Sequence, residues 1–120
     1  MLNIYKTEGG QVVRQEQLTP GCWVDVVEPT PQEVEYLTGE LELDQGFVRS
    51  SLDEEESSRI EAEDNGQVLV IVDLPVAQRQ EEDKSILYTT TTMGIILTPE
   101  YVFTISTQPQ QVVGEMADGR

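Results

Sequence analysis

A run of five consecutive apolar residues, 68–72, constrains the fold more than any other stretch of the chain. Most of these residues are β-branched, which favours an extended strand over a helix. An unbroken apolar run cannot alternate between core and water, so it predicts a strand covered on both faces, in the middle of a sheet. Pro75 has no N–H to donate to a neighbouring strand, and we expect the strand to end there.

The residues just before this run predict a hairpin. Asn65 and Gly66 both tolerate the positive φ angles that a type I′ turn requires, so residues 59–63 should form the partner strand. The side chains of that partner are expected to alternate between the core and solvent. Ile60 and Ala62 should face inward, and Glu61 and Glu63 outward.

The remaining strands are expected where apolar or alternating stretches are separated by Gly and Pro turn residues. These strands are residues 2–6, 11–15, 22–27, 86–97 and 101–106. Successive threonines within residues 86–97 add to the strand character, because threonine is stiff at χ1. Residues 77–85 are polar and acidic, and they predict an exposed loop.

Short helices are expected between the third and fourth strands. Thr30, Pro31 and Glu33 predict the start of the first, since Thr caps free N–H groups, Pro suits the first helical position and Glu completes a capping box. Asp44 is the expected N-cap of the second. The first helix is expected to bury Val34, Leu37 and Leu41 on one face, and Gly39 is expected to end it or let the chain turn. The second is expected to bury Phe47, Val48 and Leu52.

These elements predict one domain of the α+β class. We expect an αβα arrangement, with a mixed, largely antiparallel central sheet flanked by short helices. A chain of 120 residues can bury one core without disulfides. We expect residues 1–107 to form a single cytosolic αβ domain. Residues 108–120 predict the start of a truncated C-terminal helical region, with Val112, Val113 and Met116 at helical spacing.

The composition limits the classes of partner. The chain carries 23 acidic and 7 basic residues and no histidine, which gives a formal net charge of −16. This charge repels nucleic acids and anionic membranes, and it attracts cations and basic protein surfaces. A single cysteine, Cys22, excludes an internal disulfide and is typical of a cytosolic protein. We interpret Cys22 and Trp23 as buried residues rather than as a reactive thiol and a ligand-stacking ring.

The sequence contains no motif of a known catalytic site. It has no glycine-rich phosphate loop, no nucleophile elbow and no Cys or His metal signature. We therefore assign no catalytic, cofactor-binding or metal-ligating residue and predict no enzymatic activity. The acidic residues 53–56 are interpreted as a solvated helix end or loop. No stretch approaches the roughly 20 apolar residues that a membrane-spanning helix needs.

The order of these pieces is more specific than any one of them. Together they resemble the N-terminal part of the CorA-like magnesium and divalent cation transporters, across nearly the whole chain. The resemblance is a pattern of strands and turns and not a catalytic signature. The segments that carry it are residues 2–7, 20–30, 58–61, 94–98 and 102–105.

The resemblance implies a role within a larger protein. Members of the family are homopentameric magnesium channels, in which a cytosolic αβα domain precedes a long stalk helix and two membrane helices. The family's Gly-Met-Asn selectivity motif is absent from this sequence. The resemblance therefore implies a soluble fragment on the cytoplasmic side of the membrane, which does not itself insert. Its partners would be its own stalk and membrane helices and further copies of itself, and we expect the reading frame to continue past Arg120.

The resemblance also implies a weak regulatory ligand. In the family, intracellular magnesium bound between neighbouring cytosolic domains stabilises the closed pore, and a carboxylate in the loop after the central strand is one ligand. Arg79 lies near the matching position here, followed by Glu81, Glu82 and Asp83. The resemblance does not carry the ligand over to one of these residues. Magnesium or another divalent cation is expected as a weak ligand rather than a tightly bound cofactor.

Two other interpretations remain open from the residues alone. The chain could be a stand-alone acidic protein-interaction module that docks a basic surface through residues 33–64. It could also be a carboxylate-dependent hydrolase that needs added metal, which requires a deep pocket with converging acids.

Overall fold

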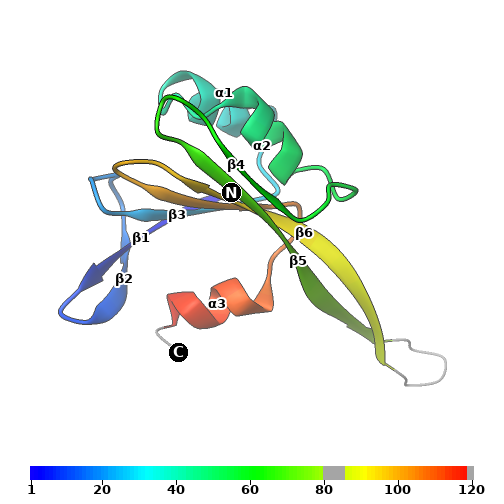
Figure 1. The fold of residues 1–120 in the computed structure, drawn as a ribbon. Helices are drawn as coiled ribbons and strands as arrows, with labels where there is room; N and C mark the ends of the chain where they lie inside the picture. Colours follow the sequence, from blue (N-terminus) through cyan, green and yellow to red (C-terminus); the bar gives the residue numbers. More distant parts are fainter. Residues whose placement is uncertain (80–85, 119–120) are drawn as a thin grey trace.

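The structure is a computed structural model that describes residues 1–79 and 86–118. The described residues form a seven-stranded sheet and three short helices (Figure 1). The strands are β1 (Leu2–Glu8), β2 (Gln11–Gln15), β3 (Trp23–Val27), β4 (Arg59–Ala62), β5 (Val68–Arg79), β6 (Ile86–Leu97) and β7 (Val102–Ser106). The helices are α1 (Pro31–Gly39), α2 (Gln45–Ser51) and α3 (Gln111–Ala117).

The strand order in the sheet is β2-β1-β3-β7-β6-β5-β4. The pair β3 and β7 is parallel, and the other five neighbouring pairs are antiparallel. Four of those antiparallel pairs join strands that follow one another in the sequence, which is the outcome expected of short hairpin connections. The mixed, largely antiparallel sheet of an α+β fold is thus confirmed.

The helices lie on both faces of the sheet but cover them unequally. Helices α1 and α2 lie together on one face, and α3 lies on the other (Figure 1). The core fills the layer between α1, α2 and the sheet. Its buried members are Val24, Val26, Leu37, Leu43, Phe47, Val48, Leu69, Ile71, Ile96, Phe103 and Ile105.

Both predicted helix starts are confirmed. The Thr30 hydroxyl accepts a hydrogen bond from the Glu33 backbone N–H at 3.1 Å, and Glu33 Oε1 accepts one from the Thr30 N–H at 2.9 Å. This is the capping box that the sequence predicted. Asp44 Oδ1 accepts from the Phe47 N–H at 3.0 Å and so caps α2. Local sequence chemistry thus fixes where both helices begin.

A glycine on β6 lets α2 pack closely on the sheet. A Cβ atom built at Gly94 would lie 1.8 Å from Ser51 Oγ and 3.0 Å from Ser51 Cα. The Ser51 hydroxyl donates to the Phe47 carbonyl at 2.8 Å, which satisfies it inside the buried contact. Any larger side chain at position 94 would therefore push α2 away from the sheet.

Strand β5 differs from the prediction in three respects. It lies next to the edge strand β4 and not in the middle of the sheet. Leu69 and Ile71 are buried beneath the helices. Val68, Val70 and Val72, which point to the other face, are only half-buried. The strand also continues through Pro75, which pairs with Thr90. β4 pairs only with the first residues of β5, so Pro75 lies in a segment that forms the sheet edge, where its missing N–H is tolerated.

The hairpin from β4 to β5 forms, but two of its predicted details are wrong. Ile60 pairs with Val70 and is 73% exposed, and Ala62 is exposed as well, so neither side chain faces the core. Glu61 lies opposite Leu69 on the face that carries α1 and α2. In the turn, Gly66 takes a positive φ of 87° but Asn65 does not, and the Asn65 side chain instead accepts a hydrogen bond from the Gln67 N–H at 3.0 Å. The turn is therefore not of type I′.

The long hairpin of β5 and β6 also changes the expected loop. Pairing runs from Val68 with Leu97 to Arg79 with Ile86, so residues 77–79, expected in a loop, belong to a strand. The other predicted strands form where expected. No helix in the described part of the chain has both the length and the apolar character to cross a membrane.

Candidate functional site

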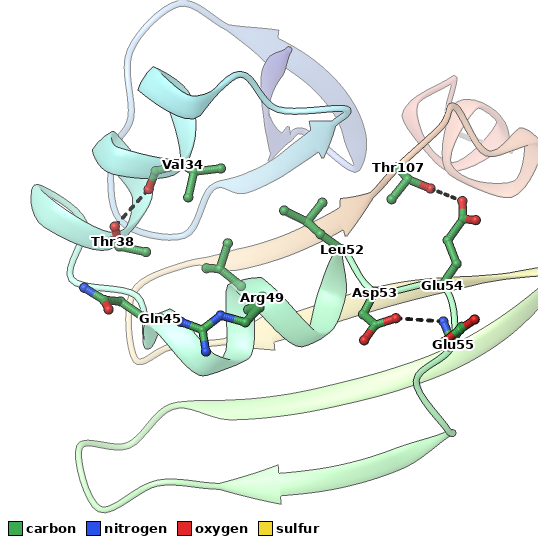
Figure 2. Close-up of a pocket in the computed structure, with 10 residues that line it drawn as sticks. Val34, Thr38, Gln45, Arg49, Leu52, Asp53, Glu54, Glu55 and Thr107 are labelled. Carbon is green, nitrogen blue, oxygen red and sulfur yellow. Dashed lines mark hydrogen bonds between the residues drawn. The ribbon is translucent and has the colours of Figure 1, made fainter.

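A groove lies on the face of the molecule that carries α1 and α2. It has a volume of about 730 Å³ and opens between the two helices and the acidic segment that follows α2 (Figure 2). Its lining residues are Val34, Thr38, Gln45, Val48, Arg49, Leu52, Asp53, Glu54, Glu55 and Thr107. They come from α1, from α2, from the segment that follows α2 and, for Thr107, from the residue after β7.

The floor of the groove is apolar. Val48 of α2 is buried, whereas Val34 of α1 and Leu52 after α2 are half-buried. The Thr38 hydroxyl donates to the Val34 carbonyl at 3.0 Å, so its polar group is satisfied within the helix (Figure 2). The sequence predicted Val34 and Leu52 as core residues. Both side chains are half-buried and pack against the core, and they also line the groove.

One end of the groove carries a rim of carboxylates. Asp53, Glu54 and Glu55 lie at this end, and Arg49 lies toward Gln45 at the other (Figure 2). The rim is held in place, because Asp53 Oδ1 accepts from the Glu55 N–H at 2.9 Å and Glu54 Oε1 accepts from the Thr107 hydroxyl at 2.7 Å. The acidic run is therefore an exposed loop, as predicted, but one with a defined conformation.

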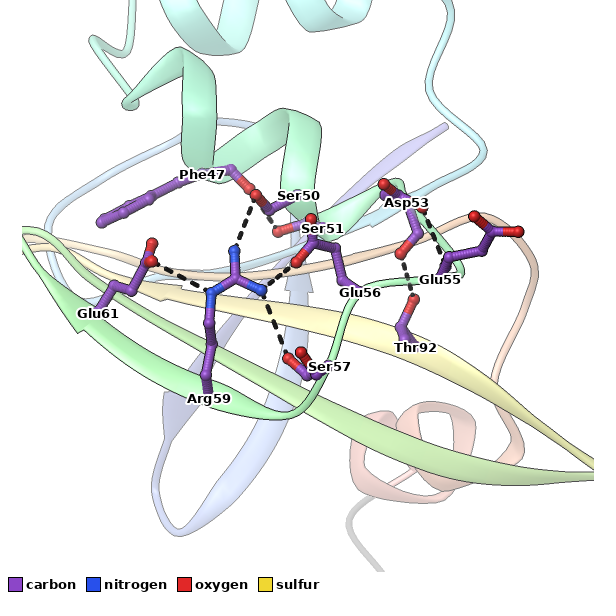
Figure 3. Close-up of polar contacts among 10 residues, drawn as sticks. All are labelled: Phe47, Ser50, Ser51, Asp53, Glu55, Glu56, Ser57, Arg59, Glu61 and Thr92. Carbon is purple, nitrogen blue, oxygen red and sulfur yellow. Dashed lines mark hydrogen bonds and ion pairs between the residues drawn. The ribbon is translucent and has the colours of Figure 1, made fainter.

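The end of the acidic segment is fixed to the sheet by Arg59. Its guanidinium pairs with Glu56, lies 3.2 Å from Glu61 Oε1 and donates to Ser50 Oγ at 3.1 Å (Figure 3). The hydrogen bond to Glu56 raises the pKa of Arg59 above its usual range. On the other side, the Thr92 hydroxyl donates to the Asp53 carbonyl at 3.0 Å (Figure 3). Glu56 is thus charge-compensated, whereas the three rim carboxylates have no ion pair within the described part of the chain.

The described acids do not form a metal site. Within residues 1–79 and 86–118, no group of three Cys, Asp or Glu side chains is placed so that it could hold a metal ion. Glu81, Glu82 and Asp83, the acids singled out by the family resemblance, lie outside the described residues. Their part in binding a cation stays a prediction.

A buried carboxylate that sequence analysis missed lies on the other face of the sheet. Asp25 of β3 is 6% exposed, and its Oδ1 accepts from the Thr104 hydroxyl at 2.9 Å. That hydroxyl accepts in turn from Trp23 Nε1 at 2.8 Å. Burial raises the pKa of Asp25, and the hydrogen bond from Thr104 opposes this shift. The signal in the sequence was an acid inside an apolar strand, between Val24 and Val26.

Trp23 and Cys22 have structural surroundings. The Trp23 ring packs on the Tyr5 ring with centroids 4.9 Å apart, and its N–H is already used by Thr104. Trp23 is half-buried rather than fully buried. Cys22 is buried, as predicted, with its Sγ 3.4 Å from Thr19 Oγ1.

The chain start is tied to α1. The amino group of Met1 lies 2.8 Å from Glu33 Oε1 and donates to the Val27 carbonyl at 2.7 Å. The hydrogen bond from the amino group, followed by that from the Thr30 backbone, lowers the pKa of Glu33. Glu33 thus serves both the capping box and this ion pair.

An apolar surface is exposed on the sheet face opposite α1 and α2. Successive side chains of a strand point to opposite faces of the sheet, so every second side chain of β4, β5, β6 and β7 lies on this face. Leu97 is 39% and Val102 38% exposed, and Ile60 is more exposed than either. With the half-buried Val68, Val70 and Ile95 they form what we call the open sheet face. Contiguous apolar surfaces of this kind mark sites of contact with other protein.

Comparisons with known proteins agree with the fold. The family model described as CorA-like Mg²⁺ transporter protein matches residues 20–119. The complete CorA magnesium transporter from Methanocaldococcus jannaschii is similar in structure, with a TM-score of 0.74 and 22% sequence identity over 97% of this chain. The soluble domain of CorA from the same organism has a TM-score of 0.73 and 23% identity over 97% of this chain.

The cytoplasmic domain of ZntB from Vibrio parahaemolyticus RIMD 2210633 is also similar, with a TM-score of 0.66 and 13% identity over 94% of this chain. At these identities the likeness establishes the fold. The chain spans 35% of the complete M. jannaschii transporter, 44% of its soluble domain and 46% of the ZntB domain. A comparison with curated protein sequences found no match.

Proposed function

Since the chain belongs to the family of CorA-like Mg²⁺ transporter proteins, we propose that it is the cytosolic regulatory domain of such a transporter. In this role it lies on the cytoplasmic side of the membrane, senses intracellular divalent cations and couples their binding to the pore. The function is that of a binding and coupling domain in a family of transporters, and no catalytic step is required of it.

The observation that carries this proposal is the match of residues 20–119 to the family model, and the open sheet face supports it. Helices α1 and α2 bury the other face, but Ile60, Leu97 and Val102 remain exposed here. Helix α3 lies on this same face (Figure 1), and the similar soluble domain is more than twice as long as the part this chain covers. We propose that further helices of the same polypeptide, followed by a stalk and membrane helices, cover the open sheet face.

Sensing of a divalent cation is supported by charge. With a net charge of −16, copies of this domain packed side by side in an oligomer repel one another. A divalent cation bound between carboxylates of neighbouring copies offsets that repulsion, so loss of the ion loosens the assembly. Magnesium acts here as a weak regulatory ligand, and Glu81, Glu82 and Asp83 are the candidate acids.

A melting experiment on the domain tests cation sensing. We expect millimolar Mg²⁺ to raise the melting temperature, or to promote self-association, beyond the effect of NaCl at matched ionic strength. The variant E81Q/E82Q/D83N should lose this excess. The control variant E8Q/E16Q/E63Q, which removes the same charge elsewhere, should keep it. An effect of Mg²⁺ equal to that of matched NaCl in the unaltered domain would refute a specific site in this part of the protein.

A further inference from the structure

We propose that the groove between α1 and α2 binds a basic amphipathic helix of a partner protein. Apolar side chains of that helix lie on Val34, Val48 and Leu52. Its Lys or Arg side chains lie against Asp53, Glu54 and Glu55. This interaction surface is on the opposite face of the sheet from the open sheet face, and it is independent of cation sensing.

The size and polarity of the groove define the ligand class. A volume of about 730 Å³ lies within the range of sites that enclose small ligands or anchoring side chains. The floor offers Val34 and Leu52, which are half-buried and so available for contact. A binding partner must therefore present apolar side chains, because a purely polar ligand would leave this floor in contact with water.

The rim defines the charge of the ligand. Three carboxylates and one guanidinium line the groove, an excess of two negative charges. Arg49 lies at the end remote from the acids (Figure 2), so it does not neutralise them. Charge complementarity thus favours Lys or Arg next to the apolar anchors, and the overall charge of −16 would speed the approach of a basic partner.

The rim is built before any ligand arrives. The Asp53 carboxylate is hydrogen-bonded to Glu55 N–H, the Asp53 carbonyl to Thr92 and the Glu54 carboxylate to Thr107. Little conformational entropy then has to be lost when a basic group binds, which is the condition for a site rather than a diffuse acidic surface. A helix suits the groove because apolar residues at i and i+4 with basic neighbours present both features on one side.

Binding of designed peptides tests the proposal. The probe is a labelled synthetic helix of about 15 residues with leucines at i and i+4 flanked by lysines, and its control has serines in place of the leucines. Fluorescence anisotropy at about 50 mM NaCl compares both peptides on the full chain. The rim variant E54Q/E55Q keeps an acceptor for Thr107. The matched variant E8Q/E16Q removes the same charge from the β1–β2 end of the molecule.

We expect the leucine peptide to bind the unaltered chain and the serine peptide to bind about tenfold more weakly or not at all. The E54Q/E55Q variant should bind the leucine peptide about tenfold more weakly than the unaltered chain does. The E8Q/E16Q variant should bind it less than about twofold more weakly. Backbone NMR shift changes should centre on Val34, Thr38 and Leu52. Equal binding of the two peptides, equal losses in the two variants, or no binding up to about 1 mM peptide would overturn the proposal. None of these outcomes depends on Mg²⁺, so they are separate from the test of cation sensing.

Discussion

Among single residues, Gly94 shows how one position controls the packing of a helix. A Cβ atom there would lie 2.3 Å from Ser51 Cβ as well as within contact of the Ser51 backbone. We expect Gly94→Ala to lower the free energy of unfolding by about 1–3 kcal/mol or more, because the side chain overpacks the contact between β6 and α2. Urea unfolding followed by circular dichroism measures this change.

Removal of the Ser51 side chain provides the control for this prediction. Ser51→Gly alone costs about 0.5 kcal/mol in helix propensity, but it makes room for the new methyl group. The double variant should therefore be more stable than the sum of the two single effects predicts. Strict additivity would show that the close approach of α2 to Gly94 is not what limits this position.

Asp25 gives a pH-dependent prediction. Burial raises its pKa in the folded state, so the ionised carboxylate destabilises the fold at neutral pH. This cost shrinks as the pH falls through the folded-state pKa, and it vanishes below the unfolded value of about 3.9, where both states are protonated. We expect Asp25→Asn to raise the melting temperature by a few degrees at pH 7 and to have little effect near pH 4.

The exposed Asp64 supplies a control for Asp25. Asp64→Asn should change the melting temperature little at either pH, because its carboxylate is solvated in both states. If Asp25→Asn destabilised the chain at pH 7, the ionised carboxylate would have to be a net favourable partner of Thr104, contrary to the direction of its pKa shift.

The residue scale also shows which features sequence alone predicts. The caps at Thr30 and Asp44 were predictable, because each side chain bonds a backbone group three residues away. The burial of Asp25 was not, since its partner Thr104 is 79 residues distant along the chain. Likewise, no local signal places Ser51 against Gly94.

For strands and helices, the two faces of the sheet differ in how much they stabilise the fold. Ile71 of β5 is 1% exposed beneath the helices, whereas Ile60 of β4 lies on the open sheet face. We expect Ile71→Ala to cost about 2–5 kcal/mol and Ile60→Ala less than about 1 kcal/mol. Chemical denaturation of the two variants compares the same substitution on opposite faces. Similar costs would mean that the open sheet face is buried in solution, for example between copies of the chain.

The errors in the predicted elements have a common physical cause. The sequence predicts that the apolar run in β5 is covered on both faces and that Ile60 faces the core. Both inferences assume that every apolar face finds a layer within the same chain. Here α1 and α2 lie on one face (Figure 1), and Ile60, Leu97 and Val102 on the other face are exposed. The hydrophobic pattern predicts that Val70 is suited to burial, but it does not predict which segment covers this side chain.

On the scale of the whole molecule, charge sets the response to salt. A net charge of −16 on 120 residues destabilises the compact state through self-repulsion, and ions screen it. We expect the melting temperature to rise by several degrees between low salt and about 0.5 M NaCl. The variant E8Q/E16Q/E63Q should show a smaller rise, because it starts with less repulsion. A melting temperature independent of salt would argue that repulsion does not limit stability.

The membership in a transporter family and the open sheet face lead to the same expectation for the full polypeptide. The most direct test is the nucleotide sequence of the native coding region downstream of the Arg120 codon. We predict an open reading frame that encodes a long helix and then two apolar segments of about 20 residues, the first ending in Gly-Met-Asn. A stop codon immediately after Arg120 would contradict the assignment of this chain as the cytosolic domain of a membrane transporter.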